Sequence, residues 1–284
     1  MGFELLFLLG LGAAGLSFML AKDGDTDAED ETLVLEGGET ETTGSGDDVI
    51  VSAAPLTEAV AVAAGDGDDL VNLDAAGISE TSFIDGEGGD DVIFVEGENA
   101  EILGGDSNDT IEVRSDIPFG GVFEISGGNG DDVIATEAYD NNIEGGDGND
   151  TIQALDMGLG TYLGGEGDDR FNLGFDYRLS FDDEEDISGG AGADHFHITA
   201  TSIEDTYVSP TEVPEGYRFG VRGDEGADTF EIQHNVEIDE TYEGKPDFVM
   251  TNSVWIEDFN PDEDTLLITP DDRSIFDGET TVSI

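Results

Sequence analysis

Aspartates that close short glycine-rich turns are the residues of this chain best suited to bind an ion. Four turns follow the pattern Gly-Gly-x-Gly-x-Asp and span 127–132, 145–150, 164–169 and 189–194. With five weaker copies there are nine turns, which end at Asp48, Asp69, Asp90, Asp109, Asp132, Asp150, Asp169, Asp194 and Asp228. Ca²⁺ takes about six to eight oxygen ligands from carboxylates and carbonyls, and such a turn offers both. Mg²⁺ suits it less well, because that ion demands a rigid octahedron and keeps its waters.

The spacing of these turns predicts a repeat architecture. Successive terminal aspartates lie 21, 21, 19, 23, 18, 19, 25 and 34 residues apart. An apolar residue stands two positions after each aspartate, at Ile50, Val71, Val92, Ile111, Ile134, Ile152, Phe171, Phe196 and Phe230. A second apolar column stands seven positions before it in all copies but the first, at Val62, Phe83, Ile102, Ile125, Ile143, Tyr162, Ile187 and Val221. Two apolar columns per repeat indicate two strands, one on each side of the turn.

A single repeat of this kind buries very little, so its stability depends on neighbours stacked at the ~4.8 Å strand spacing. Glycine permits the positive φ angles that a tight turn requires. We therefore expect an all-β fold, a parallel β-roll (β-solenoid) of about nine coils over residues 44–235. Stacking also places aspartate above aspartate, and a cation would neutralise that column. A metal-free solenoid and acidic disorder are the alternatives, but neither accounts for an aspartate in every turn and two apolar columns in register.

The charge composition narrows the class of partner. Against 70 acidic residues the chain has 8 basic ones, a formal net charge of −62. Nucleic acid is not an expected partner, because phosphate binding needs a basic surface. There is no cysteine, which excludes disulfides and thiolate metal sites. A halophile's acidic surface would explain the excess charge but not its position in the turns.

The turns match the calcium-binding repeat Gly-Gly-x-Gly-x-Asp-x-apolar-x. Over residues 44–232 the chain resembles the RTX, or hemolysin-type, calcium-binding repeat proteins. The resemblance implies Ca²⁺ between the turns of successive coils. It implies as ligands the nine terminal aspartates and the turn residues Gly104, Gly127, Asn129, Gly145, Asp147, Gly164, Glu166 and Gly189. Rolls of the family usually carry calcium turns along both edges. Here one turn per coil keeps the motif, so we expect a single column of six to eight ions.

The resemblance also implies where the protein acts. Members of the family are typically exported unfolded and fold in extracellular calcium, so we expect a secreted or cell-surface protein. Its expected role is structural or adhesive, with calcium ions as partners and any macromolecular partner unidentified; the alternative is an accessory tail of an RTX hydrolase. Residues 236–284 are expected to flank the roll as β-structure and to include a candidate secretion signal, because 255–267 looks like the strand segment that follows such repeats.

The amino-terminal segment, residues 1–22, contains a run of 17 uncharged residues from Leu5 to Ala21. At ~1.5 Å per residue, a helix of this length lies at the short end for a membrane span. We expect a single apolar helix here, and a membrane anchor, an export signal and a soluble helix are its alternatives. Residues 23–43 are expected to be an acidic flexible spacer.

The sequence contains few residues or motifs that would indicate an enzyme. Its three histidines are His195, His197 and His234, and it contains neither a His-Glu-x-x-His motif nor a nucleophile elbow. His195 and His197 flank the inward-facing Phe196, so we expect exposed strand histidines, with a transition-metal site as the alternative. The acidic run 182–186 is expected to be a solvated loop rather than a glycosidase pair. We therefore expect a protein that is not an enzyme.

Overall fold

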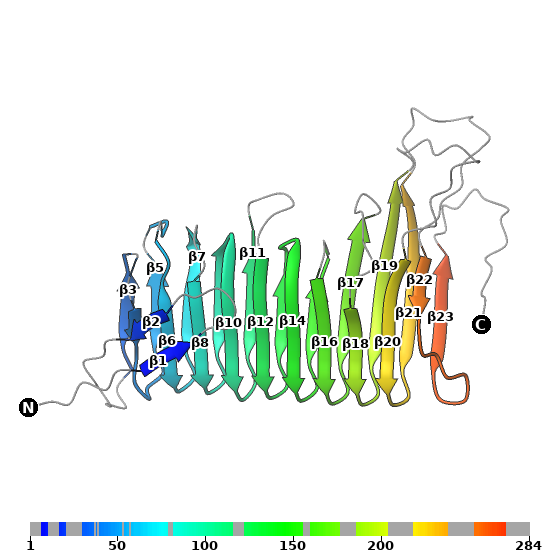
Figure 1. Cartoon of the computed structure of the whole chain (residues 1–284), viewed down its shortest axis with the longest axis horizontal. Helices are drawn as coiled ribbons and strands as arrows, with labels where there is room; N and C mark the ends of the chain where they lie inside the picture. Colours follow the sequence, from blue (N-terminus) through cyan, green and yellow to red (C-terminus); the bar gives the residue numbers. More distant parts are fainter. Residues whose placement is uncertain are drawn as a thin grey trace, which may run out of the picture.

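The computed structural model describes residues 7–10, 17–20, 30–36, 38, 40–52, 54–56, 58–78, 82–115, 122–155, 160–176, 186–203, 218–237 and 253–270. Most strands in these ranges belong to two parallel sheets that face each other (Figure 1). The even sheet, named for its even-numbered strands, contains ten: β4 (Thr40–Thr42), β6 (Ala61–Asp66), β8 (Ser82–Gly88), β10 (Asn99–Asp106), β12 (Val122–Asn129), β14 (Asp140–Asp147), β16 (Gly160–Glu166), β18 (Asp186–Ala191), β20 (Arg218–Glu225) and β22 (Ser253–Ile256).

The odd sheet contains eleven strands: β3 (Thr32–Leu35), β5 (Val49–Ser52), β7 (Leu70–Ile78), β9 (Val92–Gly97), β11 (Thr110–Arg114), β13 (Val133–Thr136), β15 (Thr151–Ala154), β17 (Arg170–Asp176), β19 (His195–Ile203), β21 (Thr229–Glu237) and β23 (Thr265–Pro270). Each coil runs down a strand of the even sheet, through a glycine-aspartate turn, and up a strand of the odd sheet. A connection of variable length then leads to the next even strand. The glycine-aspartate turns consequently share one edge of the solenoid, the lower edge in Figure 1.

The register between coils aligns the two apolar columns predicted from the sequence. In the even sheet, Ile125 pairs with Ile102 and Ile143 on the neighbouring strands. In the odd sheet, Phe196 pairs with Phe171 and Phe230. Ring centroids of Phe171 and Phe196 lie 4.6 Å apart and those of Phe196 and Phe230 lie 5.1 Å apart, both pairs stacked. The core is therefore a set of apolar stacks between the two sheets.

The all-β parallel β-solenoid predicted from the sequence is confirmed, and its strands extend beyond the predicted boundaries of the roll. β3 and β4 lie within residues 23–43, which were expected to be a flexible spacer. Leu33 and Leu35 alternate with polar or exposed residues along β3, so their side chains turn to the core, and Leu35 is buried. Strands β22 and β23 continue the two sheets into the predicted carboxy-terminal flank.

A helix over Leu5–Ala21 is not confirmed. The described residues of this segment form two short antiparallel strands, β1 (Phe7–Gly10) and β2 (Ser17–Leu20). Gly10, Gly12 and Gly15 interrupt the apolar run, and each glycine lowers helix propensity by about 1 kcal/mol relative to alanine. Across the described ranges, no helix has the length and apolar character to cross a bilayer.

Glycine is required in these turns where one coil lies directly against the next. Gly148 has a φ of 135°, and a Cβ added there would lie 2.0 Å from the carbonyl oxygen of Gly130 in the preceding coil. At Gly88, the third residue of its turn, an added Cβ would make only ordinary van der Waals contacts. The nearest atom to a Cβ at Gly88 would be Asp66 Oδ1, at 3.7 Å.

These two glycines make a matched pair for testing coil stacking. Gly148→Ala should destabilise the roll by at least about 1–3 kcal/mol, because an L-residue is strained at this φ and its Cβ overlaps the preceding coil. Gly88→Ala should change stability by less than about 0.5 kcal/mol. Urea denaturation of both variants in the presence of Ca²⁺ measures the difference. Equal losses would mean that glycine serves general turn flexibility and not the close approach of the coils.

Candidate metal centre

A column of aspartates runs inside the lower edge of the solenoid, one from each turn. The Oδ1 atom of each carboxylate accepts a hydrogen bond from a backbone N–H one coil earlier. The donor is the preceding aspartate of the column, except at Asp48, whose donor is Glu31 N–H at 2.6 Å. For Asp150, the donor is Asp132 N–H at 2.8 Å; Asp150 N–H in turn donates to Asp169 Oδ1 at 2.8 Å. The column consists of Asp48, Asp69, Asp91, Asp109, Asp132, Asp150, Asp169, Asp194, Asp228 and Asp264. All but the partly buried Asp264 are buried, so the carboxylates are closely stacked and largely shielded from water.

The third turn corrects the sequence alignment by one residue. Asp91, not Asp90, occupies the column, because Glu87 pairs with Gly105 in the second position of the turn. Asp91 is buried, whereas Asp90 is exposed and accepts a hydrogen bond from Asn108 N–H at 3.0 Å. The apolar columns shift accordingly to Ile84 and Ile93, which are both fully buried. The sequence alone did not decide this register, because Phe83 and Val92, the corresponding residues for Asp90, are apolar as well.

Asp264 was missed because its turn has no glycine. Its Oδ1 accepts the N–H of Asp228 at 3.0 Å, as the column requires. Its Oδ2 accepts the N–H of Asn260 at 2.7 Å, within its own turn. Leu266 stands two residues later, and this apolar position was the one available signal. Both oxygens of Asp264 are thus paired, so this turn lacks the unpartnered Oδ2 of the turns before it.

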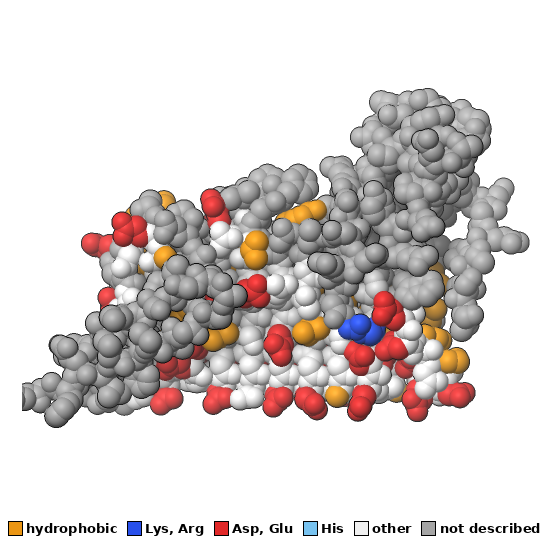
Figure 2. Space-filling model, in the orientation of Figure 1, with side chains coloured by type: hydrophobic (Ala, Val, Ile, Leu, Met, Phe, Trp, Pro, Cys, Tyr) orange, Lys and Arg blue, Asp and Glu red, His pale blue; other side chains and the backbone are white. Residues whose placement is uncertain are grey.

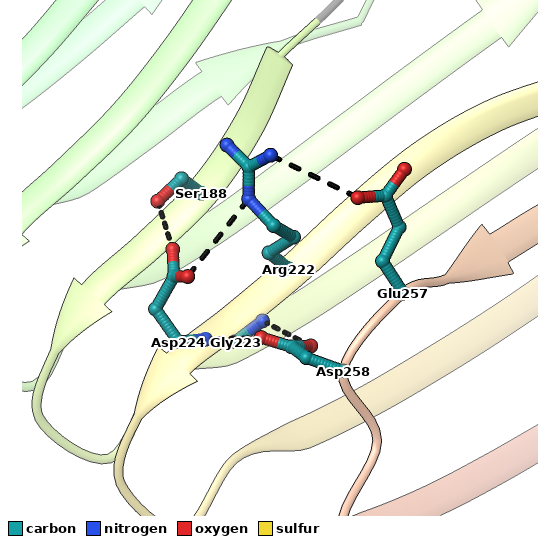
Figure 3. A network of polar contacts seen from close by, with 6 residues as sticks. All are labelled: Ser188, Arg222, Gly223, Asp224, Glu257 and Asp258. Carbon is teal, nitrogen blue, oxygen red and sulfur yellow. Dashed lines mark hydrogen bonds and ion pairs between the residues drawn. The ribbon is translucent and has the colours of Figure 1, made fainter.

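In the turn that ends at Asp228, the second position has no glycine, and polar contacts hold the backbone there (Figure 3). Asp224 takes the second position of that turn with a φ of 65°. The two carboxylate oxygens of Asp258 accept the backbone N–H groups of Gly223 and Asp224, at 3.1 and 2.8 Å. The Arg222 guanidinium lies 3.8 Å from the carboxylates of both Asp224 and Glu257. One of the few basic residues therefore offsets acidic charge at this end of the roll.

The second carboxylate oxygen, Oδ2, distinguishes the column from an ordinary hydrogen-bonded ladder. Eight of these atoms are buried with no hydrogen-bond partner, those of Asp48, Asp69, Asp91, Asp109, Asp132, Asp150, Asp169 and Asp194. An unsatisfied buried polar atom costs about 1–3 kcal/mol, and more when it is charged. Eight such atoms in one line call for ligands, and a row of cations would supply them.

Six of these Oδ2 atoms face a space that only glycine leaves open. A Cβ added at Gly145, the first residue of its turn, would lie 2.3 Å from Asp150 Oδ2 and 2.6 Å from the carbonyl oxygen of Gly164 in the next coil. The same pair of oxygens, one carboxylate and one carbonyl, faces six first-position glycines, namely Gly86, Gly104, Gly127, Gly145, Gly164 and Gly189. A carbonyl oxygen has two lone pairs, so it can accept a hydrogen bond and still coordinate an ion. The donor set therefore fits Ca²⁺.

The first two turns lack this space. Thr43 and Ala64 stand in the first position there, and both are buried. The Thr43 hydroxyl donates a hydrogen bond to the Ala64 carbonyl oxygen. The open spaces therefore begin at the coil of Asp91 and end at the gap between Asp194 and Asp228.

The predicted turn residues divide between two environments. The five predicted glycines are buried beside the column, and the space next to each of them borders a column carboxylate. They are Gly104, Gly127, Gly145, Gly164 and Gly189.

Asn129, Asp147 and Glu166 are exposed at the third position, and the structure does not bring their side chains to the column. The carbonyls of Asp147 and Glu166 accept the N–H groups of Gly130 and Gly148, both at 2.7 Å. Acidic side chains form a row along this edge (Figure 2).

A second ladder at the fifth position of each turn runs outside the aspartate column. Here the side-chain oxygen accepts the N–H of the following coil, opposite to the direction of the buried column. Asp131 Oδ1 accepts from Asn149 N–H at 2.8 Å, and Asn149 Oδ1 accepts from Asp168 N–H at 2.9 Å. These side chains are exposed. The two ladders together fix each turn to both of its neighbours.

Burial makes the column hard to ionise. Loss of solvation raises the pKa of Asp91 to about 8, although the hydrogen bond from Asp69 N–H opposes the shift; repulsion from Asp109 and Asp69 adds to it. The same causes raise the pKa to about 7 at Asp69, Asp109 and Asp169, and to about 6 at Asp150 and Asp194. Without a cation, protons are therefore the ligands that stabilise the column at neutral pH or below.

The raised pKa values predict that the ion-free fold is more stable in acid. An aspartate whose pKa is raised on folding stabilises the fold fully below about pH 4, its ordinary pKa. That contribution is lost as the pH rises through about 6 to 8, the folded values. In calcium-free buffer, far-ultraviolet circular dichroism should show more β-structure at pH 5 than at pH 8. Equal or greater β-structure at pH 8 would show that the column carries no such charge penalty.

Comparison with known proteins identifies the repeat. A family model described as the RTX calcium-binding nonapeptide repeat (4 copies) matches residues 82–102 and 126–155. The matched residues include the turns that end at Asp91, Asp132 and Asp150, three members of the buried column. No curated protein and no solved structure matches the chain. The matched repeats and the parallel β-solenoid that carries them fit an RTX-type repeat protein.

Proposed function

We propose that the chain binds about six calcium ions in one column, between successive glycine-aspartate turns. The observation that carries the proposal is the line of buried carboxylate oxygens without hydrogen-bond partners. Each ion would lie between two coils, with an aspartate Oδ2 and a glycine carbonyl of the next coil among its ligands. Other turn carbonyls and water would complete the about six to eight oxygens that Ca²⁺ takes.

We further propose that these ions drive folding, and that the folded roll has a structural or adhesive role outside the cell without catalysis. A thin coil buries few apolar side chains, and stacked carboxylates repel, so the ion-free chain lacks part of its stabilisation. Calcium sites of extracellular modules bind at about 10⁻⁴–10⁻³ M, a concentration that the cytosol does not reach. RTX repeat proteins are typically secreted, which agrees with that range.

Calcium-dependent folding is tested on residues 23–284 at pH 8. Near-millimolar Ca²⁺ should convert a largely unfolded spectrum into a β-rich one, as followed by far-ultraviolet circular dichroism. The steepness of the transition with calcium concentration counts the ions taken up on folding. Asp150→Asn keeps the Oδ1 acceptor but removes the charge, so its transition should be less steep. A β-rich spectrum in chelator that added calcium leaves unchanged would refute calcium-driven folding.

Glu144→Gln is the matched control for this substitution. Glu144 is an exposed residue of the same coil, and its change also removes one negative charge. Its transition should be as steep as that of the wild type. If Asp150→Asn and Glu144→Gln behave alike, the acidic residues act as diffuse charge and the column does not form discrete sites.

The number of ions depends on the first residue of each turn. Equilibrium dialysis at saturating calcium should give about six ions per chain. Gly145→Ala should lower that number by one, because its methyl group fills the space beside Asp150 Oδ2. Its Cβ would also lie 2.6 Å from the backbone carbonyl oxygen of Gly164, so circular dichroism must show that the variant folds; Ala64 at the equivalent position shows that such a turn can accommodate alanine. Ala64→Gly should open a further space beside Asp69 and raise the number by one. Unchanged counts in both variants would place the ions elsewhere.

A further inference from the structure

Two histidines and a glutamate meet on the outer face of the odd sheet. His195 and His197 lie two residues apart on β19, so their side chains share one face, while Phe196 between them is buried in the core. Glu231 on β21 pairs in register with His197. The three side chains are 41%, 35% and 35% exposed, which leaves them open to solvent but packed together. Although His195 follows Asp194, its side chain points away from the buried column.

The two histidine rings converge on one carboxylate oxygen of Glu231. Glu231 Oε2 lies 3.4 Å from His197 Nδ1 and 3.8 Å from His195 Nε2. The Nε2 atom of His195 is buried and has no hydrogen-bond partner. Simple ion pairing leaves this nitrogen unsatisfied, whereas a shared ligand between the two rings and the carboxylate would satisfy it.

These separations approach those of a tetrahedral metal site. Zn²⁺ binds histidine nitrogen and carboxylate oxygen at about 2.0–2.2 Å, which places neighbouring ligand atoms about 3.3–3.5 Å apart. The distance between His197 Nδ1 and Glu231 Oε2 already lies in this range. The distance between His195 Nε2 and Glu231 Oε2 exceeds it by a few tenths of an ångström. As the described residues stand, no group of three His, Cys, Asp or Glu side chains is close enough to hold a metal ion, so binding here requires the His195 ring to rotate toward Glu231.

We propose that His195, His197 and Glu231 form a surface site for a transition-metal ion such as Zn²⁺, with water as the remaining ligand. Imidazole nitrogen favours Zn²⁺, Cu²⁺ and Ni²⁺, whereas Ca²⁺ and Mg²⁺ prefer oxygen. This site therefore differs in metal preference from the oxygen-lined turns. Because it joins side chains of two neighbouring strands, it forms only in the folded roll, and its test is made with Ca²⁺ present.

Strand β17, which pairs with β19 on the side away from β21, contributes to the electrostatic surroundings of this site. On β17, Arg170 pairs in register with His195 and Asn172 with His197. Arg170 is exposed, so water screens its charge from the site. The large negative net charge of the chain favours the approach of a cation from solution.

The test uses Co²⁺ as a spectroscopic probe on the full chain in excess Ca²⁺, which occupies oxygen-lined sites. One equivalent of Co²⁺ should produce visible ligand-field absorption with nitrogen coordination, and Zn²⁺ should displace it. His197→Gln and Glu231→Gln should each lose this absorption. Both residues lie on the sheet surface, so circular dichroism should confirm that the variants fold like the wild type.

Two controls separate this site from general metal adsorption. Glu112→Gln removes another partly exposed carboxylate of the odd sheet, one that pairs with Arg114, and His234→Gln removes the remaining histidine. Both should bind Co²⁺ like the wild type. Absence of the absorption in the wild type would overturn the proposal, and so would its persistence in folded His197→Gln. Loss of the absorption in His234→Gln would also overturn it, because the ligand set would then be a different one.

Discussion

The buried column of aspartate carboxylates is the constraint on which the rest of this structure depends. Neighbouring unit charges at the ~4.8 Å strand spacing repel by roughly 3–4 kcal/mol at an effective dielectric constant of about 20. One backbone N–H per carboxylate relieves part of this cost, at Oδ1, and leaves Oδ2 without a partner. The column can therefore persist only with a proton or a cation, and the glycines beside it leave space for the cation.

The same register serves the charged column and the apolar core, so the two cannot vary independently. Phe171, Phe196 and Phe230 stack only if their turns stack. Each of them follows a column aspartate by two residues, so an ion that fixes the turns also fixes the rings. Among the residues that the structure describes, no such column runs along the opposite edge, where the connections differ in length. Two intervals are long, 34 residues from Asp194 to Asp228 and 36 from Asp228 to Asp264, and they contain the connections between β19 and β20 and between β21 and β22.

The periodicity of the sequence made the architecture predictable. Details that depend on which residues are buried could not be predicted from it. The apolar residues on both sides of each glycine turn predicted two parallel sheets and a single edge of turns. Between Asp90 and Asp91, composition alone favours neither, because glycines precede both at suitable distances; burial of Ile84 and Ile93 decides for Asp91. Asp264 could not be found from glycine, because intra-turn hydrogen bonds replace glycine there. β3 was missed because its few leucines lie within an acidic segment.

A comparison of the two ladders indicates why the inner one is charged. Both consist of side-chain oxygens that accept backbone N–H groups, and for that purpose asparagine serves as well as aspartate. The exposed outer ladder does use asparagine, at Asn108 and Asn149, and its amide groups donate to the preceding aspartates. The buried ladder has aspartate in every turn, where each charge costs most. A hydrogen-bonding role alone would favour asparagine inside and aspartate outside, so the inner charges must be retained for a positively charged ligand.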